Sequence, residues 1–208
     1  MRHGYSGQLI TCIVCFVVVM LGGCATSSPS QFYTLNALKN PEPVRQTVLS
    51  AGSVVVAVGP IILPHYLDKF EIITRSGTNE LKIHEFHRWA EGLDSSISRA
   101  IIENLWSLLP SDQFSVVRWI PGMQINAVLT YQVTIEIIRF DILPEDKTVF
   151  EADWIINKKG SPLTMQRSII TEPIKGNNFD EMVAAMSKAV EDFSHEIADI
   201  LMSQNQGD

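Results

Sequence analysis

An alternation of apolar and polar residues over residues 129–137 constrains the fold of this chain more than any other pattern. Successive side chains of a strand point to opposite faces of a sheet, so this period predicts one buried face and one wet face. The same period recurs over residues 150–156, and the turn at residues 157–160 leads into a return strand over residues 163–171. We therefore predict an antiparallel meander. On its return strand, the wet face is expected to carry Thr164, Gln166 and Ser168.

Two segments carry apolar residues at steps of three and four, which predicts amphipathic helices over residues 87–109 and 179–202. Pro110 marks the end of the first helix. Asn178 is a candidate N-cap for the second helix, with Glu181 three residues further on. Together with the meander, these segments predict an α+β fold of two layers, in which a largely antiparallel sheet is packed by two long amphipathic helices.

Shorter apolar runs predict the remaining strands, over residues 31–35, 53–58, 67–75, 81–86 and 113–120. Pro60 and Pro64 flank a further apolar stretch after the second of these strands. Proline has no N–H to donate to a neighbouring strand, so this stretch is expected to form an edge or a bend rather than a central strand.

The N-terminus has the pattern of a secretory leader. Arg2 and the free amino group precede an apolar run over residues 9–21, which suits a signal peptide and is short for a membrane-spanning helix. The sequence Leu21-Gly22-Gly23-Cys24 then resembles the lipobox of bacterial lipoproteins. That resemblance implies that Cys24 carries a lipid and that the chain is cut just before it. The alternative is an ordinary signal peptide with a chance cysteine, or an uncleaved anchor.

These features divide the chain into a signal peptide (residues 1–23), a lipidated tether (24–30) and a single periplasmic domain (31–208). The tether is small and polar, and fully extended it reaches only about 20 Å. Ala25 stands where aspartate would signal inner-membrane retention, so by resemblance to other lipoproteins we expect the periplasmic face of the outer membrane.

Charge and cysteine content restrict the possible partners. The leader contains Arg2 and no acid, so its loss moves the formal net charge of −7 to −8, and no basic run is present. Nucleic acid is therefore not expected as a partner. Cys12 and Cys15 leave with the leader and Cys24 is taken by lipid, which leaves no cysteine for a disulfide or a metal site. An acidic domain is not attracted to anionic lipid by its charge, so membrane attachment depends on the lipid on Cys24.

The sequence contains none of the catalytic motifs G-x-S-x-G, H-E-x-x-H or a phosphate-binding glycine loop. His84 and His87 flank Glu85, but a metal site would need a third ligand in a suitable frame. We therefore predict no catalytic residue, no metal and no cofactor other than the covalent lipid on Cys24. Several methionines could line a lipid groove or fill the core, and the helical spacing favours the core. They are Met123, Met165, Met182, Met186 and Met202.

A proline-stiffened apolar segment over residues 58–68 is a candidate partner surface. The alternative is an edge that packs on the core, and the sequence favours neither interpretation over the other. The residues proposed for partner contact are Pro60, Leu63, Pro64, Tyr66 and Leu67.

Several stretches in order resemble the PqiC/YmbA-type auxiliary lipoproteins of ABC-type lipid transport systems. They are the lipobox, Phe32-Tyr33-Thr34-Leu35, Val58-Gly59-Pro60, Leu63-Pro64-His65-Tyr66-Leu67-Asp68, Glu71-Ile72-Ile73-Thr74-Arg75 and Arg88-Trp89-Ala90-Glu91-Gly92-Leu93. The resemblance spans essentially the whole mature chain.

This resemblance implies a non-enzymatic outer-membrane lipoprotein that works with an MCE-domain protein and its inner-membrane permease and ATPase. Such a subunit would dock the far end of a phospholipid transport tube as a homo-oligomer and support membrane integrity. Cys24 is the only functional residue that the resemblance transfers. A lipoprotein that activates a periplasmic cell-wall enzyme is the alternative, although the short tether argues against it. A periplasmic hydrolase is disfavoured by the absence of a nucleophile motif.

Overall fold

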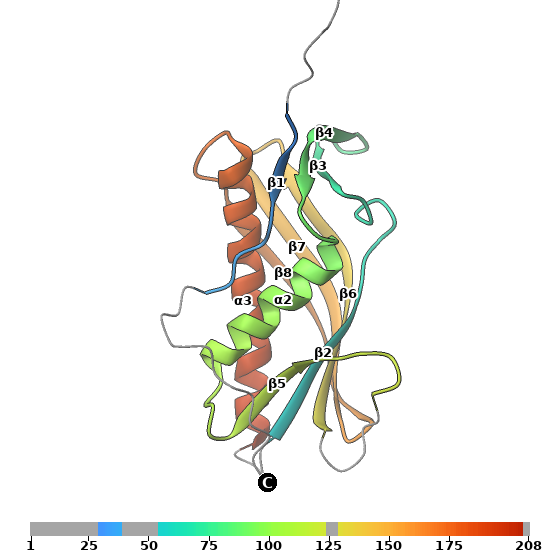
Figure 1. Cartoon of the computed structure of the whole chain (residues 1–208), viewed down its shortest axis with the longest axis vertical. Coiled ribbons are helices and arrows are strands. Elements are labelled where there is room, and N and C mark those ends of the chain that lie inside the picture. The colour runs from blue at the N-terminus through green and yellow to red at the C-terminus, as the bar shows by residue number, and fades with distance from the viewer. Residues whose placement is uncertain (1–28, 39–53, 124–128, 206–208) are drawn as a thin grey trace, which may run out of the picture.

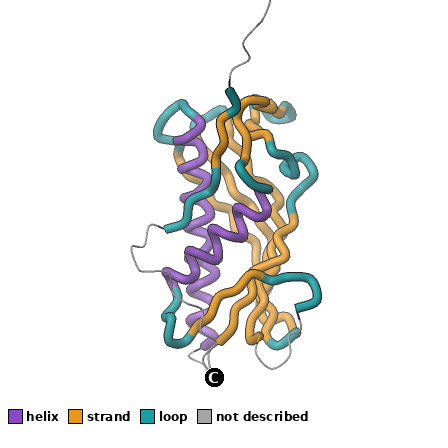
Figure 2. Tube along the Cα trace, viewed as in Figure 1, coloured by secondary structure: helices purple, strands orange, loops and turns teal. Residues whose placement is uncertain are grey.

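The computed structural model describes residues 29–38, 54–123 and 129–205, which form a two-layer α+β domain (Figure 1, Figure 2). Within these ranges an eight-stranded sheet forms one layer and two helices form the other, which confirms the predicted fold class. The elements are β1 (Gln31–Tyr33), β2 (Val54–Ile62), β3 (Glu71–Arg75), β4 (Leu81–Trp89), α2 (Leu93–Leu108), β5 (Phe114–Arg118), β6 (Leu129–Leu143), β7 (Lys147–Lys158), β8 (Ser161–Pro173) and α3 (Phe179–Asn205). The predicted leader and Cys24 lie outside the described residues.

The long strand β6 joins the two branches of the sheet. One of its edges pairs antiparallel with β7, and β7 pairs antiparallel with β8, so the predicted meander is confirmed. The other edge is shared, because β2 pairs in parallel with the first part of β6 and β3 pairs with Ile142 near its end. The β2 branch continues to β5, and the β3 branch continues through β4 to β1. The sheet therefore adds shorter parallel pairs to a long antiparallel meander.

Both helices cover the same face of the sheet, since each presents one apolar stripe. α3 packs along β7 and β8, and α2 packs against β2, β5 and α3. In the centre, Phe193 of α3 contacts Phe150 and Trp154 of β7, with ring centroids 4.9 and 5.5 Å apart. Asn178 caps α3 as predicted, because its side-chain oxygen accepts a hydrogen bond from the amide of Glu181 at 2.9 Å.

The start of the first helix differs from the prediction. α2 begins at Leu93 rather than at His87, and β4 extends to Trp89. The last residues of β4 pair with β1, and the Trp89 amide donates a hydrogen bond to the carbonyl of Phe70 at 2.7 Å. Trp89 is buried, so its position in the core was predicted correctly. The error arose because an apolar residue just before a helix fits the inward face of a strand equally well.

β2 bends at its first proline. The Gly59-Pro60 peptide bond is cis, Gly59 has a φ of 122°, and the register against β6 shifts after Val58. β5 pairs with β2 only as far as Val58, so Pro60 follows the point where the sheet ends on that side. The predicted bend is confirmed, but the strand continues beyond it along β6 to Ile62.

Candidate functional site

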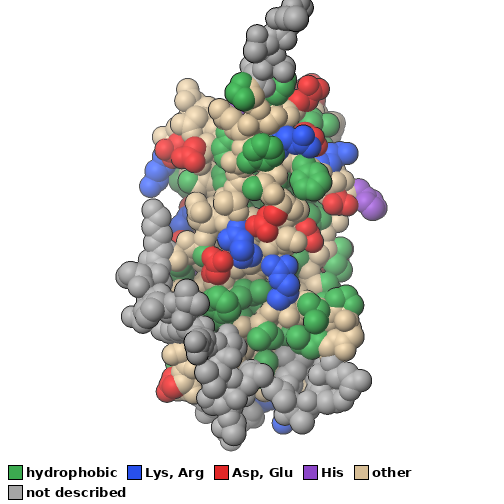
Figure 3. Space-filling view, in the orientation of Figure 1, with side chains coloured by type: hydrophobic (Ala, Val, Ile, Leu, Met, Phe, Trp, Pro, Cys, Tyr) green, Lys and Arg blue, Asp and Glu red, His purple; other side chains and the backbone are tan. Residues whose placement is uncertain are grey.

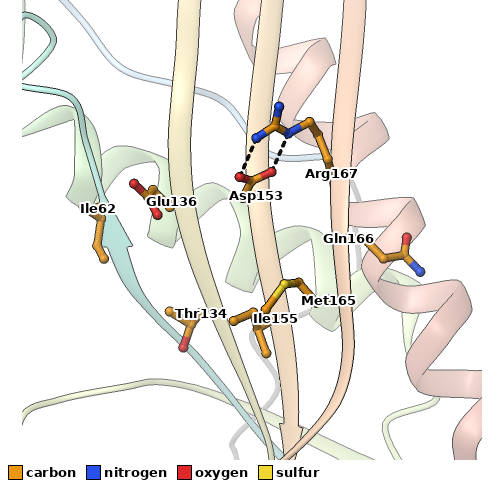
Figure 4. A pocket seen from close by; sticks show the side chains of 8 residues that line it. All are labelled: Ile62, Thr134, Glu136, Asp153, Ile155, Met165, Gln166 and Arg167. Atoms are coloured by element: carbon orange, nitrogen blue, oxygen red, sulfur yellow. Dashed lines mark hydrogen bonds and ion pairs between the residues drawn. The ribbon is translucent and has the colours of Figure 1, made fainter.

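A groove of about 430 Å³ lies on the face of the sheet that the helices leave uncovered (Figure 4). Strand pairing sets its side chains in two neighbouring rows, because paired residues of adjacent strands point to the same face. The first row crosses four strands through Ile62, Glu136, Asp153 and Arg167. The second row consists of Thr134, Ile155 and Met165. The three consecutive strands of the meander and the sequence-distant β2 therefore build one continuous surface.

The return strand β8 presents the opposite face from the one predicted. Thr164, Gln166 and Ser168 pair with buried residues of β7, so their side chains lie on the helix-facing side. Gln166 still borders the groove, and Figure 4 shows its side chain turned away from Met165. The buried Ser168 hydroxyl accepts a hydrogen bond from Trp154 Nε1 at 2.9 Å and donates one to the carboxylate of Glu196. The prediction was wrong because alternation defines two faces, whereas only strand pairing decides which face is covered.

The uncovered face is consequently more apolar than predicted. Met165 is 72% exposed. Ile169, four residues further along β8 and on the same face, is 62% exposed. Ile62 at the opposite side of the groove is also exposed, and Ile155 lies between them on β7. Large apolar side chains that remain in water on a sheet face mark a surface that another molecule can cover.

One fixed pair of charges lies among these apolar side chains. Arg167 donates two hydrogen bonds to the carboxylate of Asp153, at 2.6 and 2.7 Å. These bonds lower the pKa of Asp153 and raise the pKa of Arg167, so both groups are charged at neutral pH. An exposed pair of this kind adds little to stability, but it can orient a partner on the surface. The groove thus offers apolar contact and an oriented charge pair.

The predicted partner segment after the bend of β2 is partly buried. Leu67 is only 5% exposed and belongs to the core, so it cannot contribute to a partner surface as predicted. Leu63 and Tyr66 are half-buried and pack against the core, and the two prolines, Pro60 and Pro64, are also half-buried. The loop folds back onto the sheet because its apolar side chains gain more by burial there than in water.

A buried carboxylate holds this loop to the sheet. Asp141 of β6 accepts a hydrogen bond from the Tyr66 hydroxyl at 2.9 Å and another from Arg75 Nε at 2.8 Å, and Arg139 lies 4.0 Å away. Burial, and then the Asp141 charge, raises the pKa of Tyr66 above its usual value, so its hydroxyl stays protonated and remains a donor. The cluster therefore fixes the loop that follows Ile62 at the border of the groove.

Most groove residues carry no distinctive signal in the sequence. In the sequence, Ile155 is notable only because it interrupts a polar face. Met165 is notable only as one of several methionines. Met186 is buried, and Met182 and Met202 pack against the core, which confirms the core interpretation for them. Met165 is the exposed exception. The available signal was Ile155, an apolar residue on the otherwise polar face of β7, and only the strand register places Met165 beside it.

The two histidines of β4 form part of an aromatic cluster. A bulge in β4 places His84 and His87 on the same side, with ring centroids 6.3 Å apart. His87 stacks on Phe179 at 3.7 Å and shares a hydrogen bond of 2.9 Å with the Tyr33 hydroxyl, while His84 shares one of 2.9 Å with Thr74. Within the described ranges, no group of three or more His, Cys, Asp or Glu side chains is placed to hold a metal ion.

Acidification is expected to destabilise this cluster. Burial, followed by the charges of Lys82 and His87, lowers the pKa of His84 below its ordinary value of 6.5. The folded state therefore favours neutral His84, and its contribution to stability is lost as the pH falls from 6.5 through the lower folded pKa. In urea titrations between pH 7.5 and 5, His84→Gln should lose less stability on acidification than the wild type. His195→Gln, an exposed position on α3, should follow the wild type; an identical decline in all three proteins would contradict the prediction.

The fold is a two-layer α+β domain with one sheet face that the helices leave uncovered. Comparison of sequences then places it: the chain belongs to the family of ABC-type transport auxiliary lipoprotein components, whose family model matches residues 33–198. It is 20% identical to the intermembrane transport lipoprotein PqiC of Escherichia coli, over 84% of this chain and 88% of that protein. PqiC of Shigella flexneri matches to the same extent. The predicted family is therefore confirmed.

Solved structures share the fold. A crystal structure of an uncharacterized protein aligns with a TM-score of 0.68 at 17% identity, over 84% of this chain and 99% of that one. Protein XCC0632 from Xanthomonas campestris aligns with a TM-score of 0.64 at 14% identity, over 86% of this chain and 98% of that one. No helix in the described part of this chain is long and apolar enough to cross a membrane.

Proposed function

We propose that this chain is an outer-membrane-anchored subunit of an ABC/MCE-type intermembrane phospholipid transport system. In this role it docks the far end of an MCE-domain tube at the outer membrane and supports membrane integrity. The observation that carries the proposal is the uncovered groove on the sheet, where Ile62, Ile155 and Met165 surround the Asp153–Arg167 pair. A surface of this composition, with exposed apolar side chains beside an oriented charge pair, is typical of contact with a protein partner.

The proposed anchor is the lipid on Cys24. The family consists of lipoproteins, and the acidic chain has no basic run to bind anionic lipid by charge. Several acyl chains on one cysteine make a lasting attachment, because each buried CH₂ contributes about 0.8 kcal/mol. With the short tether and Ala25, this anchor supports the outer membrane as the site of action and keeps the groove close to the bilayer.

The groove proposal is tested by the matched substitutions Met165→Lys and Gln166→Lys in the full lipoprotein. The two residues are adjacent and exposed on β8 and both border the groove, but their side chains point to opposite faces and only that of Met165 lies on the uncovered face. Met165→Lys should reduce co-purification of the MCE-domain protein from membranes by roughly tenfold or more, because it puts a charge where an apolar contact is proposed. Gln166→Lys should leave it unchanged.

Other results would identify other occupants. If Met165→Lys abolishes crosslinking between copies of this chain but not capture of the MCE-domain protein, the groove joins subunits of the proposed homo-oligomer and the docking surface lies elsewhere. Capture of a penicillin-binding protein in place of an MCE-domain protein would overturn the transport assignment in favour of cell-wall enzyme activation. Equal capture by all variants would show that the groove takes no part in docking.

A further inference from the structure

A second exposed apolar surface lies at the end of the domain where β1 begins. Figure 3 shows several hydrophobic side chains at the end of the body where β1 and β4 lie. We call this surface the apical patch. It consists of Phe32 (64% exposed), Phe70 (55%), Leu81 (38%), Ile83 (50%) and Phe86 (42%).

Strand pairing explains why these side chains lie at one end. β1 pairs in parallel with the last residues of β4, which places Phe32 beside Arg88. β3 and β4 form a hairpin in which Ile83 lies opposite Ile73, and the bulge of β4 follows. Phe70 joins them because its carbonyl accepts the hydrogen bond from the Trp89 amide. The patch therefore belongs to the β3 branch of the sheet and is separate from the groove on β6 to β8.

No helix covers this face of the branch within the described residues. The first turn of α3 packs on the opposite face, where Phe179 stacks on His87 and contacts Tyr33. Phe32 and its neighbours consequently remain in water although they are large and apolar. Large apolar residues that are exposed together lower solubility unless a membrane or another molecule covers them.

The length of the tether indicates what that phase is. Five residue steps separate Cys24 from Pro29, the first described residue, and an extended chain of that length spans at most about 18 Å. β1 begins two residues later, and in Figure 1 the chain enters it at the same end of the body as the β3–β4 hairpin. A lipid on Cys24 therefore holds the apical patch close to the headgroups of the bilayer.

We propose that the apical patch rests in the interfacial region of the bilayer that holds the Cys24 lipid, and so orients the domain on the membrane. This inference rests on the proposed lipid anchor. Phenylalanine and branched aliphatic side chains gain free energy at the boundary between headgroups and acyl chains. Arg88, which lies beside Phe32 and forms an ion pair with Glu71 at 3.1 Å, provides a polar border for the patch. With a net charge of −8, the mature chain needs such apolar contact, because charge alone does not draw it to lipid.

Depth-dependent quenching in the full lipoprotein tests this contact. Cys24 is the only cysteine left after the leader, and its sulfur is blocked by lipid, so Phe32→Cys, Ile83→Cys and Ser203→Cys each add one reactive thiol for an environment-sensitive fluorophore. Ser203 is exposed near the end of α3, at the opposite end of the body (Figure 1). The labelled proteins are reconstituted in phosphatidylethanolamine–phosphatidylglycerol vesicles with or without a lipid spin-labelled near its headgroup.

We expect the fluorophores at positions 32 and 83 to be quenched severalfold more than the one at position 203, with all three proteins floating with the vesicles. Flotation without quenching at positions 32 and 83 would overturn the patch proposal and leave the anchor intact. Equal quenching at all three positions would overturn the proposed orientation. Loss of flotation would overturn the anchor, and with it the patch proposal. If position 83 instead forms disulfides between copies without quenching, the patch joins two subunits and the membrane proposal is wrong.

Discussion

Cys24→Ala is expected to move this protein from the membrane fraction to the soluble periplasmic fraction. The reason is the difference between several acyl chains and none, since even a single myristoyl chain gives only an association constant of roughly 10⁴ M⁻¹ and stable attachment needs at least two chains. The acidic body supplies no basic run to replace them. Membrane flotation followed by detection of the mature chain measures the shift.

The matched control is Cys15→Ala, which also removes a cysteine but lies in the predicted leader. It should leave the protein in the outer-membrane fraction. The Cys24 variant is exported behind a leader with an ordinary cleavage site, so that an uncut apolar segment cannot act as an anchor. If the cleaved Cys24→Ala protein still fractionates with the outer membrane, the lipid is not what holds it there.

Asp141→Asn is expected to lower the stability of the folded domain substantially, because it removes a charge from a buried cluster. The Asp141 side chain is 3% exposed and faces Arg75, whose side chain is 21% exposed. Removing the Asp141 charge leaves Arg75 without its buried counter-charge, whereas Arg139 keeps Glu151 at 4.0 Å. Breaking a buried pair costs about 3 kcal/mol at the lower end of its range. For a domain of this size that loss lowers the midpoint of thermal unfolding by roughly 10 °C.

Asp153→Asn is the matched control, since Asp153 is also bonded to an arginine on the same sheet but is exposed at both partners. Its thermal midpoint should stay close to that of the wild type, because solvent screens an exposed pair. Circular dichroism of both variants at neutral pH gives the comparison. Equal midpoints for the two variants would show that burial of Asp141 does not govern its contribution.

The positions of the apical patch and the groove define how the domain would be oriented in the proposed function. The apical patch and the start of β1 lie at one end of the long axis, and the groove lies on strands that run along that axis (Figure 1). In the proposed arrangement the domain stands on the membrane and presents the groove to the side, where an MCE-domain tube or a neighbouring subunit can reach it. The buried Asp141 cluster then serves to hold the Tyr66 loop at the border of that groove.

Local patterns predicted the long elements well. The period of two in β6 and β7 identified inward residues such as Val133 and Trp154, and the stripe of α3 identified Phe193, because these residues repeat with the period of the structure that buries them. The same patterns could not separate the end of β4 from the start of α2. Trp89 is inward in either element, so only the pairing of β4 with β1 excludes the helix.

By itself, the sequence determined the α+β class, the meander, the α3 cap and the family, since these follow from periodicity, local hydrogen bonding and ordered motifs. Only the tertiary structure decided which face of β8 is covered, where the Tyr66 loop lies, and that Ile62, Ile155 and Met165 share one groove. The physical reason is that a strand's two faces are equivalent until neighbouring strands and helices choose between them. The binding surface depends on that choice, and the choice is made by contacts between residues far apart in the chain.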